Sequence, residues 1–137
     1  MARICAKRRW INAPFEDIVD RMRGDFDYGT GRVVQNSPHQ MRYWKDFASY
    51  PFQSHDLWFL TENIRWGYLP RDFDGKAWIA KVNREDLWRA AAAELGVPAA
   101  QIPKSTSRGV EKFFDGKVFD PANPKAYLDS LTIKHLR

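Results

Sequence analysis

The sequence predicts a mainly helical fold with irregular loops and little strand. Hydrophobic residues make up 44% of the 137 residues, a usual share for one globular domain. Eight glycines and eight prolines are spread along the chain, which limits the helices to short lengths between turns. Aromatic residues reach 15% and include six tryptophans, so bulky side chains should anchor the core or the interfaces. Because no internal repeat or low-complexity linker interrupts the pattern, we expect a single unit over residues 1–137.

Two helices are predicted in the first 24 residues. Residues 2–7 have the pattern of a short helix that begins with the chain. The next helix has Asn12 or Ala13 near its cap. Pro14 takes its first position and Gly24 ends it. Its apolar face recurs every three or four residues, at Phe15, Ile18 and Met22.

Residues 24–40 predict a loop or hairpin, because they contain three glycines and a proline among alternating residues. Within them, "GDFDYGTGR" offers Asp25 and Asp27 at the first spacing of a calcium loop, but the positions that follow break that pattern. The segment also lacks the third glycine of a dinucleotide-binding loop. We therefore expect a polar turn in which Arg32 pairs with a nearby acid.

Two aromatic helices are predicted next. The first covers residues 41–51 and must stop near Pro51. The second covers residues 54–67, with Ser54 as its N-cap and Gly67 at its end. The buried stripe of this second helix consists of Leu57, Leu60 and Ile64, widened by Trp58 and Phe59.

Alanine-rich composition marks the clearest helix of the chain, over residues 83–96. Asn83 is its predicted cap, four alanines run through its middle, and Gly96 closes it. A shorter helix precedes it at residues 74–83.

The last third of the chain predicts less regular structure. Residues 109–121 suggest a helical turn followed by a short extended piece. A final helix covers residues 123–131, with Asn123 as its cap and Pro124 at its first position.

The charge balance is basic, with 22 Lys and Arg against 17 Asp and Glu, a net charge of +5. Such a balance fits nucleic acid, an anionic membrane or an acidic partner. The positive charges are scattered apart from a cluster at residues 7–9, so we expect no nucleic-acid partner. The start lacks the apolar run of a signal peptide, and no stretch approaches the ~20 apolar residues of a membrane span.

No metal, cofactor or catalytic site is predicted. His39, His55 and His135 do not stand at metal-ligand spacing, although His55 could hold a neighbouring loop by a hydrogen bond. Cys5 is the only cysteine and reads as a small apolar residue of the first helix. We interpret Glu62 and Arg65 as a surface ion pair that stabilises its helix by a few tenths of a kcal/mol.

One segment could contact an anion. In "PKSTSRG", residues 103–109, two cations, three hydroxyls and a glycine could hold an oxyanion through charge and backbone amides. The alternative is that the hydroxyls cap a helical turn that begins near Gly109. The candidate ligand-binding residues are Lys104, Ser105, Thr106, Ser107 and Arg108.

Four stretches together resemble one family: "YGTGRVV", "HDLWFLTENIRWGYLP", "VNREDLWRAAAAELGVP" and "STSRGVEKFFDGKVFDPANPKAYL". They are similar, in the same order, to the C-terminal part of the substrate-binding protein of nitrate-type ABC importers, a group that includes bicarbonate receptors. The likeness runs from about Ile4 to Ile133. We therefore expect the chain to be the C-terminal part of a larger solute-binding protein with a two-lobed, type II periplasmic-binding-protein-like α/β fold.

The resemblance implies a non-enzymatic role. The intact receptor would be periplasmic or membrane-anchored, would bind nitrate, nitrite or bicarbonate, and would deliver it to an ABC permease. The anion-contacting residues of the family lie mainly upstream, so none is carried over to this chain. This part would supply packing, with Trp58 and Trp66, about 80° apart around a helix, as anchors. The alternatives are a receptor-like regulatory or sensor domain of a nitrate-type transporter ATPase and a basic nucleic-acid-binding module.

Overall fold

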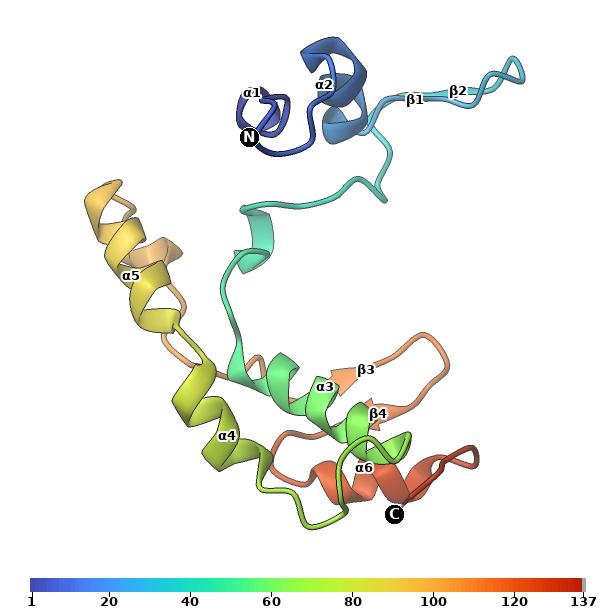
Figure 1. The fold of residues 1–137 in the computed structure, drawn as a ribbon, viewed down its shortest axis with the longest axis vertical. Coiled ribbons are helices and arrows are strands. Elements are labelled where there is room, and N and C mark those ends of the chain that lie inside the picture. Colours follow the sequence, from blue (N-terminus) through green and yellow to red (C-terminus); the bar gives the residue numbers. More distant parts are fainter. Residues whose placement is uncertain (137) are drawn as a thin grey trace. The chain divides into compact units, whose positions relative to one another are not determined.

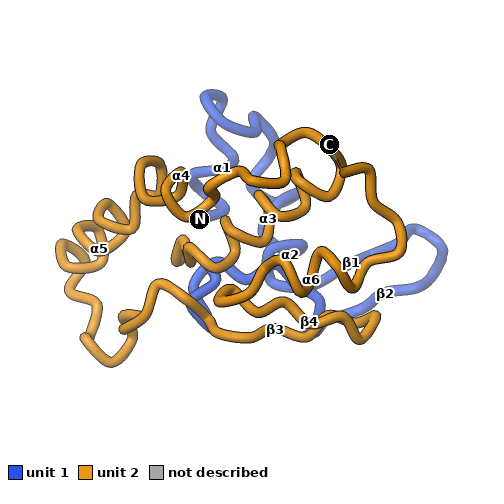
Figure 2. Tube along the Cα trace, turned by 90° about the horizontal axis from the view of Figure 1, so that it is seen from below, with its two compact units in different colours: residues 1–48 blue, residues 49–137 orange. Residues whose placement is uncertain are grey.

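The computed structural model describes residues 1–136, which form helices joined by loops and two short hairpins. The mainly helical character with little strand is as the sequence predicted. The chain divides into two compact units, an N-terminal unit of residues 1–48 and a C-terminal unit of residues 49–137 (Figures 1 and 2). Each unit is described by itself below. That residues 1–137 behave as a single unit stays a prediction.

The N-terminal unit begins with two helices that pack on each other. Helix α1 is Ala2–Cys5 and helix α2 is Phe15–Arg23. The guanidinium of Arg3 lies 5.2 Å from the centre of the Phe15 ring, a cation–π contact between the two helices. Pro14 is the N-cap of α2 and not its first residue, so the helix begins one residue later than predicted.

Gly24 ends α2, as predicted, and leads into a hairpin. Its φ of 94° is left-handed backbone that favours glycine. A Cβ at this position would lie 3.0 Å from the nitrogen of Ser37, which donates to the Gly24 carbonyl. Strands β1, Phe26–Asp27, and β2, Val33–Val34, then pair antiparallel, with Phe26 opposite Val34.

The helix predicted at residues 41–51 is wrong. Only a 3-10 turn forms, at Lys45–Phe47, and Asp46 and Phe47 have left-handed φ angles of 58° and 59°. The side chains of residues 41–49 are all exposed. A short helix that buries no apolar face gains too little from packing to offset its nucleation cost, so the segment stays irregular.

In the C-terminal unit, helix α3, Gln53–Arg65, packs against α4, Gly75–Val82, and against α6, Pro124–Ser130 (Figure 1). Helix α5, Glu85–Glu94, follows α4, and a 3-10 helix covers Ala99–Gln101.

Residues 109–121 form a hairpin instead of the predicted helical turn and extended piece. Strand β3, Glu111–Lys112, pairs antiparallel with β4, Val118–Phe119, and β4 packs on α6. The hairpin places the Phe119 side chain in the core, where it is 3% exposed.

Three helix N-caps were predicted in the C-terminal unit: Asn123 is confirmed, Asn83 lies one residue before the observed N-cap, and Ser54 is wrong. Asn123 accepts a hydrogen bond from the Ala126 amide and caps α6. Asn83 accepts from the Glu85 amide, although the N-cap position of α5 is Arg84. Ser54 lies inside α3, whose N-cap is Phe52, so its hydroxyl is free for another contact.

The core of the C-terminal unit lies between α3, α4, α6 and β4. The aromatic rings meet edge to face or tilted, with Phe119 5.5 Å and Phe113 5.9 Å from the Tyr127 ring. Phe59, predicted to widen the buried stripe, is instead 61% exposed. The buried cluster consists of Leu57, Ile79, Phe119, Tyr127 and Leu131, with Trp58, Leu60 and Phe113 partly buried against it.

The pair Glu62–Arg65 is not the simple surface pair that the sequence predicted. The side chains are only 16% and 20% exposed. The Tyr127 hydroxyl donates to Glu62, and Arg65 Nε donates to the carbonyl of Ile133 at 2.9 Å. The pair therefore ties α6 and the C-terminal tail to α3.

Candidate functional site

The candidate anion-binding segment, residues 103–109, passes over the start of α3 and is fixed at both ends. The carbonyl of Pro103 accepts a hydrogen bond from Arg89 Nη2 of α5 at 2.9 Å. Near the other end, the amide of Arg108 donates to the hydroxyl of Ser54 at 3.1 Å. Because Ser54 is 5% exposed, this second bond is well shielded from water.

A polar network holds Arg89 in place. The Tyr50 hydroxyl donates to Glu85, and Arg89 donates from Nε to Glu85 at 3.1 Å and from Nη2 to the Tyr50 oxygen at 2.9 Å. Burial raises the pKa of Tyr50, and the neighbouring Glu85 carboxylate raises it further. The hydrogen bond from Tyr50, together with Arg89, holds the pKa of Glu85 below its usual value. Glu85 is therefore an acceptor and Tyr50 a donor at neutral pH.

The backbone amides of the segment are already used. The hydroxyl of Ser105 accepts from the Ser107 amide, and the hydroxyl of Ser107 accepts from the Gly109 amide, both at 3.0 Å. With the Arg108 amide bonded to Ser54, three consecutive amides point at side-chain oxygens. The hydroxyls thus close local turns. The alternative prediction, that they cap a helical turn beginning near Gly109, is wrong. An anion would not find these amides free.

Arg108 also has partners within the protein. Its Nε lies 3.6 Å from Glu111 Oε1, and its guanidinium lies 5.7 Å from the centre of the Phe52 ring. The same Glu111 oxygen is 2.9 Å from His55 Nε2, which confirms that His55 holds a neighbouring segment. A carboxylate this close offsets the attraction of Arg108 for an anion.

Two of the five candidates line a shallow pocket of about 240 Å³. Thr106 and Ser107 face it together with Lys76 from α4. Lys104 and Ser105 are exposed and do not line it. Sequence reasoning missed Lys76 because no motif marks it; only the packing of α4 against α3 brings it here. One amino group and two hydroxyls could make a weak anion contact, so an anion-binding role for residues 104–108 stays a prediction.

The loop "GDFDYGTGR" closes without an ion pair from Arg32 to a described residue, so that prediction is wrong. The Asp27 carboxylate accepts from the Gly29 amide at 2.8 Å. Arg32 instead lies with its guanidinium 5.0 Å from the Tyr28 ring centre, because the antiparallel turn places the two residues opposite each other. Over residues 1–136 no three His, Cys, Asp or Glu side chains gather as a metal site. No helix in that part has the length and apolar character to span a bilayer.

The bond from Ser54 to the segment makes a testable prediction. Ser54→Ala removes the buried hydroxyl that accepts from the Arg108 amide, which should lower the free energy of unfolding by about 1 kcal/mol. Chemical denaturation of the whole chain measures the change. Ser105→Ala removes an exposed hydroxyl of the same segment and should cost less than about 0.5 kcal/mol. Equal effects of the two substitutions would contradict the role of Ser54.

Comparison with known proteins gives close matches along the whole chain. The sequence is 59% identical over 138 residues to a nitrate/nitrite binding protein of Synechocystis, covering 100% of this chain and 31% of that protein. It is 41% identical over 142 residues to a bicarbonate-binding protein of Synechococcus elongatus, covering 98% of this chain and 32% of that protein. A nitrate import ATP-binding protein of Synechococcus elongatus is 33% identical over 109 residues, or 80% of this chain and 16% of that protein.

A solved structure matches as well. The crystal structure of the periplasmic nitrate-binding protein from Synechocystis superposes with a TM-score of 0.80 at 59% identity, covering 96% of this chain and 34% of that chain. The chain thus spans about a third of the length of the binding proteins it matches. No family model matches the sequence.

Proposed function

This chain is related over its whole length to the C-terminal part of the substrate-binding proteins of nitrate- and bicarbonate-type ABC importers, and from this relationship we propose that it serves such a receptor. The receptor would bind nitrate or a related small oxyanion on the periplasmic side and pass it to an ABC permease. The match of the whole chain to 31% of a nitrate/nitrite binding protein, at 59% identity, carries this proposal. The role is one of binding and packing, without enzymatic chemistry.

Within that receptor, the chain would supply packing and leave anion contact to other parts. The amides of residues 107–109 are occupied, and Arg108 faces Glu111. Large apolar side chains remain exposed on the C-terminal unit and could be covered by the rest of a receptor. They include Phe59, Trp66, Tyr68 and Trp78.

The test compares the chain alone with the chain combined with the preceding two thirds of the Synechocystis relative. Isothermal titration with nitrate should give no saturable binding to the chain alone. Co-expression of the two parts should give a complex that binds nitrate. As a control, Arg108→Gln in the complex should leave nitrate affinity within about twofold. Saturable nitrate binding by the chain alone, or a tenfold loss in Arg108→Gln, would place anion contacts in this segment and overturn the packing role.

A second candidate is a receptor-like domain attached to a transporter ATPase. The match to a nitrate import ATP-binding protein favours it, although the identity is much lower than to the binding proteins. Sequencing the DNA that precedes the Met1 codon separates the two. An ATPase in the same reading frame would support this second role, and an α/β lobe behind an export signal would support the first.

A further inference from the structure

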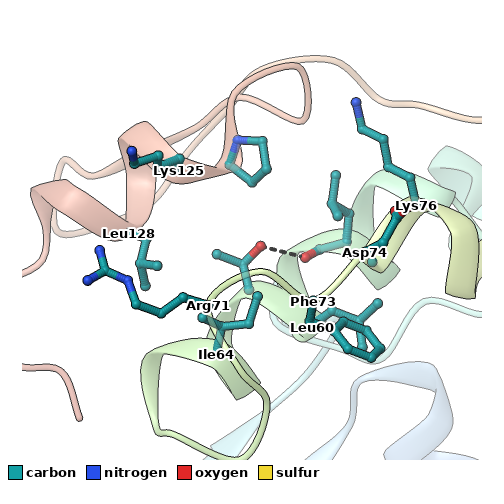
Figure 3. A pocket seen from close by; sticks show the side chains of 12 residues that line it. Leu60, Ile64, Arg71, Phe73, Asp74, Lys76, Lys125 and Leu128 are labelled. Carbon is teal, nitrogen blue, oxygen red and sulfur yellow. Dashed lines mark hydrogen bonds between the residues drawn. The ribbon is translucent and has the colours of Figure 1, made fainter. Parts of the chain in front are cut away.

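The C-terminal unit contains a second pocket, of about 290 Å³, between α3, α4 and α6. Its apolar surface comes from α3, from the loop before α4 and from α6, and Leu57 and Leu128 belong to its buried part. Figure 3 shows these side chains around an open space. The apolar lining residues are Leu57, Leu60, Ile64, Phe73, Pro124 and Leu128.

Three cations stand around this apolar surface. Arg71 and Lys125 lie near Leu128 on one side, and Lys76 extends from α4 on the other (Figure 3). All three are exposed, and none of them makes an ion pair with another residue in the range 1–136. The acid of the pocket, Asp74, uses its Oδ1 to cap α4 through the Ala77 amide. The lining therefore carries an excess of two positive charges, three cations less one carboxylate.

We propose that this pocket binds a small organic carboxylate. The apolar body of the ligand lies on the leucine and phenylalanine side chains, and its carboxylate lies at the side of the pocket where Arg71 and Lys125 stand. Ligand pockets combine an apolar lining with a few polar groups that fix orientation, and this volume is at the lower end of their range. Arginine and lysine form strong charge-assisted hydrogen bonds to carboxylates, which the apolar surroundings strengthen.

The chemistry distinguishes this ligand from the alternatives. An inorganic oxyanion such as nitrate would pair with the cations but would leave the apolar surface in water. A neutral apolar molecule would cover that surface but would leave three cations without a counter-charge. Only a ligand with both parts uses both features of the pocket. The site is separate from the transport role proposed above and does not depend on it.

The test titrates the full chain with phenylacetate at low ionic strength and follows it by NMR. Phenylacetate should bind saturably, and its neutral isostere phenylacetamide should bind at least tenfold more weakly. The double substitution Arg71→Gln with Lys125→Gln should weaken phenylacetate binding at least tenfold. Both side chains are exposed, so the variant should fold normally. The matched control is the double substitution Lys81→Gln with Lys112→Gln, two exposed cations outside the pocket, which should leave the affinity unchanged.

Several results would overturn the proposal. Absence of saturable phenylacetate binding would do so, as would equal affinities for the acid and its amide. Equal loss of affinity in the control and in the pocket variant, which both remove two positive charges, would mean that net charge, and not this pocket, attracts the anion. Tighter binding of nitrate than of phenylacetate would assign the cations to an inorganic oxyanion.

Discussion

Replacing Trp58 with alanine is expected to lower the free energy of unfolding of the C-terminal unit by about 3 kcal/mol. The ring packs against the core, with its centre 5.4 Å from that of Phe113 and 4.9 Å from that of Phe59. Its indole nitrogen is buried and has no hydrogen-bond partner among residues 1–136. The substitution therefore removes packing and leaves a cavity. Urea denaturation followed by circular dichroism measures the change.

The matched control for Trp58 is another tryptophan of the same unit. Trp78 on α4 is 49% exposed, and Trp78→Ala should cost less than about 1 kcal/mol because water already covers much of the ring. A loss in Trp58→Ala within about 0.5 kcal/mol of zero, or equal to that of Trp78→Ala, would contradict the role of Trp58 as a core anchor.

Replacing Arg89 with alanine should cost about 2 kcal/mol, because three acceptors lose their donor at once. These acceptors are Glu85, the Tyr50 hydroxyl and the carbonyl of Pro103. The contact joins α5 to the segment before α3 and to the loop at residue 103. The Arg89 side chain is 36% exposed, so solvent screening keeps the cost below that of a fully buried ion pair. Denaturation of the variant beside the unmodified chain gives the difference.

Arg84, the N-cap residue of the same helix, provides the control. It donates two hydrogen bonds to Asp86, but the side chains are 59% and 63% exposed. Arg84→Ala should therefore leave the free energy of unfolding nearly unchanged. If Arg84→Ala cost as much as Arg89→Ala, the number of ion pairs rather than the buried network would set the stability.

The pH dependence of the Arg89 effect has a defined sign. Folding lowers the pKa of Glu85, through the Tyr50 hydrogen bond and then Arg89. The stabilisation is therefore present above the unfolded-state pKa of about 4.3 and is lost as the pH falls through the lower folded pKa. The stability difference between the unmodified chain and Arg89→Ala should shrink as the pH is lowered from 7 towards 3. A constant difference would contradict the contribution of the Arg89–Glu85 pair.

Helices with local signals were predicted well from the sequence. Gly24 ends α2 because its left-handed backbone suits glycine, and Asn123 caps α6 through its own side chain. These features depend on interactions within a few residues, so the local sequence is enough to predict them. The segment at residues 41–51 also looked helical, but its residues 41–49 are exposed and it forms only a 3-10 turn.

Predictions that needed distant partners were the least reliable. Ser54 looks like a helix cap, yet it lies inside α3 and binds the Arg108 amide, 54 residues away. The two serines at positions 105 and 107 suggested either an anion site or a helix cap, and they close turns instead. Lys76 carries no motif, and it became part of two pockets only through the packing of α4.

The sequence by itself determined the helical class, most helix ends and the relationship to a family of anion-binding proteins, because these depend on local patterns and on long stretches in order. The tertiary structure alone decided which polar groups are already satisfied and which cations remain without a partner. Glu62 and Arg65 illustrate the reason, since their spacing indicates only a pair on one helix, whereas the fold surrounds them with Tyr127 and Ile133. Hydrogen bonds and burial between distant segments follow from packing, which no local pattern encodes.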